Sequence, residues 1–193
     1  MSRAEIINRL RDAFRQYGYE GASVQRLTEA TGLGRGSLYH HFPGGKDEMA
    51  EAVLDHIADW FDTEVFAPLR TDAPPAAAVA LMLDHLADFY GHGEASCLAG
   101  AMALGEAKDT FAAHLRRIFT QFVAELARVC ERAGQSPAQA KRSATDAVVR
   151  IEGALIVARG TGDRSVFTDT LRAVPEQLLG AGAAKPRRRA AGA

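Results

Sequence analysis

The stretch "SVQRLTEATGLGRGSLYHHF", residues 23–42, contains two short helical segments separated by glycines. Val24 and Leu27 lie on one face of the first segment, for which Ser23 is a suitable N-cap. Gly32 predicts the end of that helix, because glycine adopts a positive φ without a Cβ penalty. A helix, a short turn with glycine and a second helix form a helix-turn-helix, whose second helix enters the major groove of DNA.

The second segment begins at Gly34 or Arg35 and ends at Pro43. Its first turn, with Arg35, Gly36 and Ser37, is the end of a recognition helix that faces base edges. We expect Arg35 to bind a guanine through two hydrogen bonds, and Gly36 to let the backbone approach the DNA closely. Contacts to phosphates, which fix the register without reading sequence, are assigned to three further residues: Tyr39, His40 and Lys46.

The glycines of "GLGRG", residues 32–36, could instead belong to a loop that holds the phosphates of a nucleotide cofactor. Such a loop needs the pattern G-x-G-x-x-G after a strand, and an acidic residue about 20 positions further on. The match here is incomplete and the surrounding periodicity is helical. We therefore interpret the glycines as a turn and expect no cofactor.

Helical periodicity continues along the rest of the chain, which predicts an all-α protein of about nine helices. A long helix is expected from Asp47 to Pro68. Further helices are expected near residues 74–91, 96–108, 109–134, 137–160 and 164–180. The predicted domains are a three-helix helix-turn-helix head (1–46), a helical body for ligand binding and dimerisation (47–182) and a basic flexible tail (183–193).

The charge is unevenly distributed along this chain of net charge −1. Residues 1–46 contain seven Lys or Arg against four Asp or Glu, whereas the remainder up to the tail is acidic. A basic head favours an anionic partner such as DNA. The tail sequence "KPRRR", residues 185–189, either adds non-specific phosphate contacts or is merely solvated.

Cysteine usage and hydropathy indicate a soluble cytoplasmic protein that does not enter a membrane. Cys97 and Cys130 form no CxxC pattern, which argues against a disulfide scaffold or a zinc module. His85, His92 and Cys97 lie in one region without the i, i+4 spacing of zinc helices, so no metal site is expected. No nucleophile, base and orienting group occur at a recognisable spacing, so an enzyme is not expected either.

The stretch "SVQRLTEATGLGRGSLYHHFPGGKDEMAEAVL", residues 23–54, resembles the DNA-binding signature of the TetR family of bacterial transcriptional regulators. The doubled glycine of "HHFPGGK" and the later "CLAGAMALGEA" are similar to its LmrA/YxaF-type branch. The resemblance implies a homodimer on a near-palindromic operator, released when the C-terminal domain binds a small-molecule effector. It also implies backbone contacts from the supporting helix, through Gln25, Arg26 and Thr28.

Two further sets of residues are expected to serve the body. Aromatic, methionine and histidine side chains could line an effector pocket: Trp60, Phe61, Met82, His85, Phe89, Met102, Phe119 and Phe122. An apolar stripe on the last two helices is assigned to the dimer interface, with an intrachain core as the alternative: Val148, Ile151, Leu155, Phe167, Leu171 and Val174. The alternative function is a helical small-molecule-binding or adaptor protein without sequence-specific DNA binding.

Overall fold

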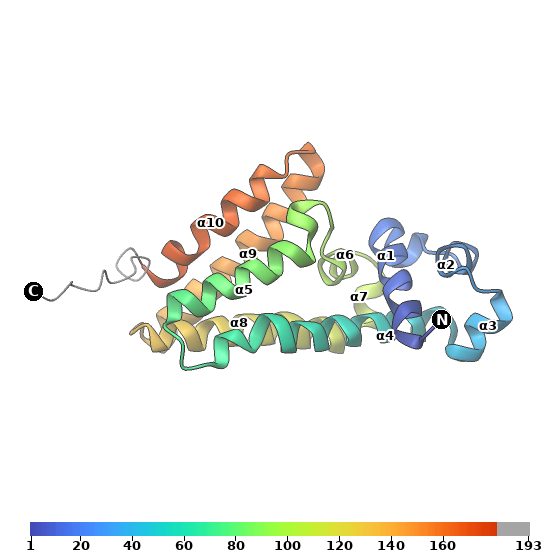
Figure 1. Ribbon diagram of the computed structural model, residues 1–193, viewed down its shortest axis with the longest axis horizontal. Coiled ribbons are helices and arrows are strands. Elements are labelled where there is room, and N and C mark those ends of the chain that lie inside the picture. Colours follow the sequence, from blue (N-terminus) through green and yellow to red (C-terminus); the bar gives the residue numbers. More distant parts are fainter. Residues whose placement is uncertain (181–193) are drawn as a thin grey trace, which may run out of the picture. The chain divides into compact units, whose positions relative to one another are not determined.

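The computed structural model describes residues 1–180, in which helices are joined by short turns and loops and no strand occurs (Figure 1). The α-helices of this part of the chain are α1 (Arg3–Gly21), α2 (Val24–Thr31), α3 (Arg35–His41), α4 (Gly45–Trp60), α5 (Pro75–Phe89), α6 (Leu98–Leu104), α7 (Ala107–Thr110), α8 (Ala112–Arg132), α9 (Pro137–Thr161) and α10 (Ser165–Leu179). A π-helical turn (Phe61–Phe66) and short 3-10 turns (Pro68–Arg70, Gly91–Gly93) connect some of them. The predicted tail 183–193 lies outside the described residues.

The all-α prediction is confirmed, with two local corrections. The helix expected over 96–108 is broken at Gly105, whose extended backbone separates α6 from α7. The cause is tertiary: the Glu20 carboxylate accepts a hydrogen bond from the Ala107 amide (3.0 Å), and a Cβ on Gly105 would lie 2.7 Å from that carboxylate. The helix expected from Asp47 to Pro68 begins at Gly45 and becomes π-helical at Phe61.

The chain divides into two compact units. Among the described residues, the first unit comprises residues 1–63 and 95–120, and the second comprises residues 64–94 and 121–180. The first unit holds α4, α6 and α7 together with the helix-turn-helix, so the functional boundary expected at residue 46 stays a prediction.

In the first unit, α1 packs against α2 and α4 around a core that includes Phe14, Leu27, Leu38 and Phe42, all fully buried. The Ser23 hydroxyl accepts a hydrogen bond from the Arg26 amide and so caps α2, as predicted. Local sequence signals therefore determine where α2 begins, and buried apolar side chains hold it and α3 in place.

In the second unit, α10 packs along α9 and against α5. A carboxylate on α8, Glu125, is only 4% exposed and lies 2.9 Å from the Arg70 guanidinium and 2.7 Å from that of Arg128. Burial alone would raise the pKa of Glu125, but the hydrogen bonds from the two arginines outweigh it and hold that pKa below its ordinary value. This ion-pair cluster fixes the Pro68–Arg70 turn to α8.

Candidate nucleic-acid interface

The first turn of α3 is exposed, and no other described part of the chain packs over Gly36. Arg35, Gly36 and Ser37 are all exposed, whereas the following Leu38 is fully buried and fixes the helix to the core. Gly34 occupies the N-cap position and provides no side-chain hydrogen bond. A Cβ built on Gly36 would meet no atom within 4 Å, so packing within the chain does not require glycine at this position.

The turn between the two helices has the predicted geometry. Gly32 has a φ of 70° and ends α2, and its amide donates to the Thr28 carbonyl at 2.9 Å. Thr31 is buried and its hydroxyl donates to the Leu27 carbonyl at 2.7 Å. The turn is therefore determined by backbone conformation and local hydrogen bonds, as a helix-turn-helix requires.

The residues assigned to phosphate contacts lie on α3 and at the start of α4. Arg35 lies 5.5 Å from the ring centroid of Tyr39, and His40 is exposed. The ammonium group of Lys46 lies 4.2 Å above the ring of Tyr19, whose hydroxyl is hydrogen-bonded to the Asp47 carboxylate. Burial, and then that carboxylate, raise the pKa of Tyr19, so the ring under Lys46 stays neutral.

The three α2 residues assigned by resemblance bond within their own chain. Gln25 donates to the Glu29 carboxylate at 3.0 Å, and the Thr28 hydroxyl donates to the Gln25 carbonyl at 2.7 Å. Arg26 donates to the Gly21 carbonyl at 2.7 Å, with its guanidinium over the ring of Tyr17. Their part in binding phosphates stays a prediction.

Sequence reasoning missed two arginines of α1 that reach the helix-turn-helix. Arg3 donates to the backbone carbonyl at the end of α3, and Arg9 donates to the one at the end of α2. The available signal was weak: an arginine in the first turn of a helix, where the helix dipole favours acidic residues.

The eight residues assigned to an effector pocket belong to both units. Trp60, Phe61, Met102 and Phe119 lie in the first unit, and Met82, His85, Phe89 and Phe122 lie in the second. The second unit contains a cavity of about 100 Å³ between α9 and α10, and one of about 330 Å³ between α5 and α10. Neither cavity is lined by any of the eight, so the assignment stays a prediction.

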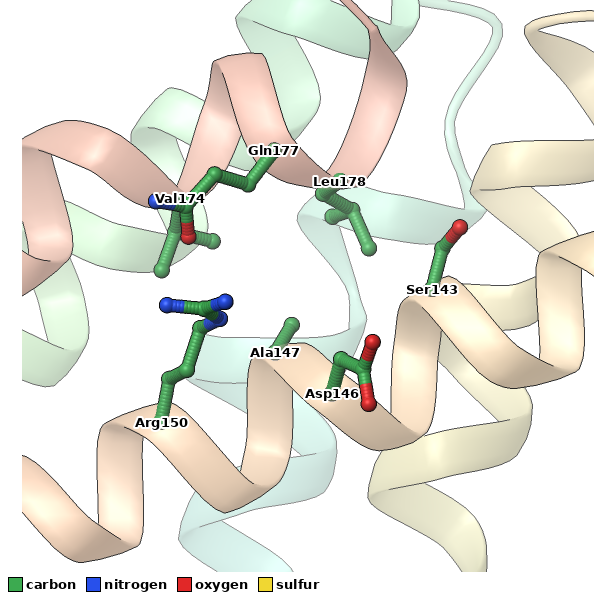
Figure 2. Close-up of a pocket in the computed structure, with 7 residues that line it drawn as sticks. All are labelled: Ser143, Asp146, Ala147, Arg150, Val174, Gln177 and Leu178. Atoms are coloured by element: carbon green, nitrogen blue, oxygen red, sulfur yellow. The ribbon is translucent and has the colours of Figure 1, made fainter.

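Figure 2 shows the cavity between α9 and α10, with the Arg150 side chain pointing across it toward α10. Its polar lining consists of Ser143, Asp146, Arg150 and Gln177. This lining belongs to α9 and α10, the two helices whose apolar stripes were assigned to the dimer interface.

The six residues assigned to the dimer interface require a correction. All six are buried within the single chain: Val148, Ile151, Leu155, Phe167, Leu171 and Val174. These side chains are core residues, which was the alternative left open by the sequence. A different face of α9 is exposed, with Val149 at 64%, Ile156 at 62% and Val157 at 48%.

The cysteines and histidines form no metal site among the described residues, where no group of three or more metal-binding side chains occurs. The Cys97 sulfur accepts a hydrogen bond from the Gly100 amide at the start of α6. Cys130 is buried, and this burial raises the pKa of its thiol to about 11. Over residues 1–180, no helix is both long and apolar enough to span a membrane.

Comparison with known proteins identifies both parts of the chain. Residues 6–53 match the family model for bacterial regulatory proteins of the tetR family. Residues 75–173 match the model for the C-terminal domain of LmrA/YxaF-like transcriptional regulators, which spans half of the chain. The chain belongs to the TetR family. This TetR-family chain is thus a transcriptional regulator with a helix-turn-helix head, as the resemblance implied.

Relatives and solved structures agree with this assignment. The HTH-type transcriptional regulator LmrA of Bacillus subtilis is 21% identical over 183 residues, covering 92% of this chain and 96% of that protein. The HTH-type transcriptional repressor AcnR of Corynebacterium efficiens is 52% identical over 52 residues, which cover 27% of each chain. A TetR transcriptional regulator from Legionella pneumophila has the same fold, with a TM-score of 0.80 at 18% identity over 91% of this chain and 96% of that one. All three of these proteins are named as regulators or repressors of transcription.

Proposed function

We propose that this TetR-family chain is a cytoplasmic, ligand-responsive repressor that binds a near-palindromic operator as a homodimer and is released by a small-molecule effector. The observation that carries the proposal is that the first turn of α3 is exposed, while Leu38 and Phe42, which follow it, are buried and anchor the helix in the core. Repression is the activity named for the AcnR relative, whose similarity spans 52 residues of this chain.

Reading of the operator is assigned to Arg35, whose guanidinium is exposed and can donate two hydrogen bonds to guanine O6 and N7. Ser37 is the second polar side chain of this turn, and the open surface at Gly36 permits close approach of the DNA. Tyr39, His40 and Lys46 then contact phosphates and set the register.

The homodimer is assigned to the exposed face of α9, defined by Val149, Ile156 and Val157 together with Gly153 and Gly160. The three apolar side chains are 48–64% exposed. A Cβ on either glycine would meet no atom within 4 Å, although a glycine inside a helix costs about 0.5–1 kcal/mol relative to alanine. Exposed β-branched residues beside such glycines favour close contact with a second helix, here the same face of a second copy.

Release by an effector is assigned to the body, residues 47–182. A ligand lowers operator affinity only to the extent that it prefers the conformation that does not bind DNA. The predicted pocket residues, from Trp60 to Phe122, are the first positions at which substitutions should alter effector binding.

The deciding experiment is selection of bound duplexes from a random pool, followed by affinity measurement for the recovered site and a scrambled site at two salt concentrations. We expect an inverted repeat whose half-sites are about 34–36 Å apart, bound about 10³-fold or more tighter than the scrambled duplex. Binding that is salt-sensitive but recovers no motif would refute operator recognition and leave the adaptor function.

The dimer face is tested by sedimentation of the double variant Val149→Lys with Ile156→Lys. Two charges on this face should produce a monomer that retains its helical content. Leu81→Lys is the matched control, since Leu81 is also an exposed apolar residue, at 48%, but lies on α5. A double variant that sediments as a dimer would show that another surface joins the copies.

A further inference from the structure

Two side chains of α1 bind the ends of the two helices of the helix-turn-helix. The Arg3 guanidinium donates from Nη1 to the carbonyl of His41, the last residue of α3, at 2.8 Å. The Arg9 guanidinium donates from Nη1 to the carbonyl of Thr31, the last residue of α2, at 2.9 Å. Each of the two helices thus has one C-terminal carbonyl satisfied by α1.

The recognition helix has few other means of fixing its ends. It contains only seven residues, and its N-cap, Gly34, provides no side-chain hydrogen bond. A helix this short is not stable in isolation. Its last carbonyls lack partners within the helix, and the Arg3 guanidinium, which also lies 4.5 Å from the centroid of the Phe42 ring, supplies one.

The charge of Arg3 is better placed for α3 than for α1. Arg3 is the first residue of α1, where the positive end of the helix dipole disfavours a cation. The C-terminus of α3 is the negative end of a dipole, where the same cation is favoured. Arg9 repeats the arrangement at α2, and its Nη1 lies 3.5 Å from where a Cβ on Gly32 would be, beside the turn.

We infer that Arg3 and Arg9 are positioning residues for operator recognition, which orient α3 and α2 through their C-terminal carbonyls without reading DNA themselves. The inference rests on the proposed function and deepens it. It predicts that loss of either arginine lowers the affinity for the operator more than the affinity for a scrambled duplex. The affinity for the scrambled duplex depends on charge and should fall only by the effect of one lost positive charge.

The test compares the full-length variants Arg3→Ala, Arg9→Ala and Arg3→Lys with a control of equal charge change, Arg11→Ala. Arg11 is also on α1, and its hydrogen bonds to other described residues are to Asn8 and Asp12 of the same helix. Each variant is measured for affinity to the selected operator and to a scrambled duplex at two salt concentrations. Amide hydrogen exchange of α3 and α4, without DNA, provides a readout independent of binding.

We expect Arg3→Ala and Arg9→Ala to lose about 5- to 10-fold in the ratio of operator to scrambled affinity, the effect of one ordinary intramolecular hydrogen bond. The amides of α3 should exchange faster in Arg3→Ala while those of α4 do not change, and Arg3→Lys should recover most of the ratio. Arg11→Ala should retain the ratio of the unaltered protein.

Two results would overturn the inference. If the ratio of operator to scrambled affinity is the same in Arg3→Ala, Arg9→Ala and Arg11→Ala, the hydrogen bonds to the ends of α3 and α2 do not position these helices. A salt slope that falls by about 0.9 per protomer in Arg3→Ala but not in Arg11→Ala would show that Arg3 binds a phosphate directly. Failure of the unaltered protein to prefer any operator is a different outcome, because it refutes the proposed function and, with it, a role in recognition.

Discussion

Replacement of Gly36 by alanine should change the stability of the protein and its affinity for the operator in opposite directions. Gly36 lies in α3, and a Cβ at this position meets no atom of the chain within 4 Å. Alanine therefore introduces no clash and removes the entropy cost of glycine, so the free energy of unfolding should rise by about 0.5–1 kcal/mol. If the turn approaches the bases closely, the added methyl group should weaken operator binding by about 1–3 kcal/mol, the scale of one base contact.

Gly32→Ala is the matched control, because it makes the same chemical change four residues earlier. Gly32 has a φ of 70°, which an L-residue adopts at a cost of about 1–2 kcal/mol, so this variant should be destabilised. Urea unfolding gives both stabilities, and titration of the selected operator gives both affinities. The reasoning is refuted if Gly36→Ala lowers stability, or if it binds the operator as tightly as the unaltered protein.

Three further predictions concern the same fold. Arg35→Ala should lose about 1–3 kcal/mol of operator affinity and relax base preference at one position per half-site, as measured by repeating the selection. Lys46→Ala should weaken binding to the operator and to the scrambled duplex equally, since a phosphate contact carries no sequence information. The dependence of log affinity on log salt concentration should become shallower by about 0.9 per protomer. The lowered pKa of Glu125 means that its stabilising effect is present above the pKa of the unfolded carboxyl and is lost as the pH falls through the folded pKa. Glu125→Gln should therefore be less stable than the unaltered protein at pH 7, and urea titrations should show that the difference narrows toward pH 4.

Local signals were sufficient to predict the helix-turn-helix. The Ser23 cap and the positive φ at Gly32 depend on residues adjacent in sequence, and both are confirmed. The break at Gly105 could not be predicted, because the carboxylate that requires it comes from Glu20, at the other end of the first unit's sequence. Periodicity cannot reveal such a long-range contact.

The dimer interface was misassigned for a different reason. Helix α9 is apolar on two faces, and periodicity locates both without indicating which one its own chain covers. Ile151 is fully buried within its own chain, whereas Ile156, five residues later, is exposed. The roles of the DNA-contacting residues also remain predictions, since they depend on a partner and not on the fold.

Helix α1 is bonded at both ends, and this gives it a mechanical role. Near its start Arg3 holds the end of α3, and at its far end Glu20 holds the first amide of α7. Between them the backbone is helical except at Gly18, whose angles (φ 68°, ψ 172°) are not helical. Any movement of α7 that is transmitted along α1 toward Arg3 passes through this non-helical residue, while the hydrogen bond between Tyr19 and Asp47 also connects this end of α1 to α4.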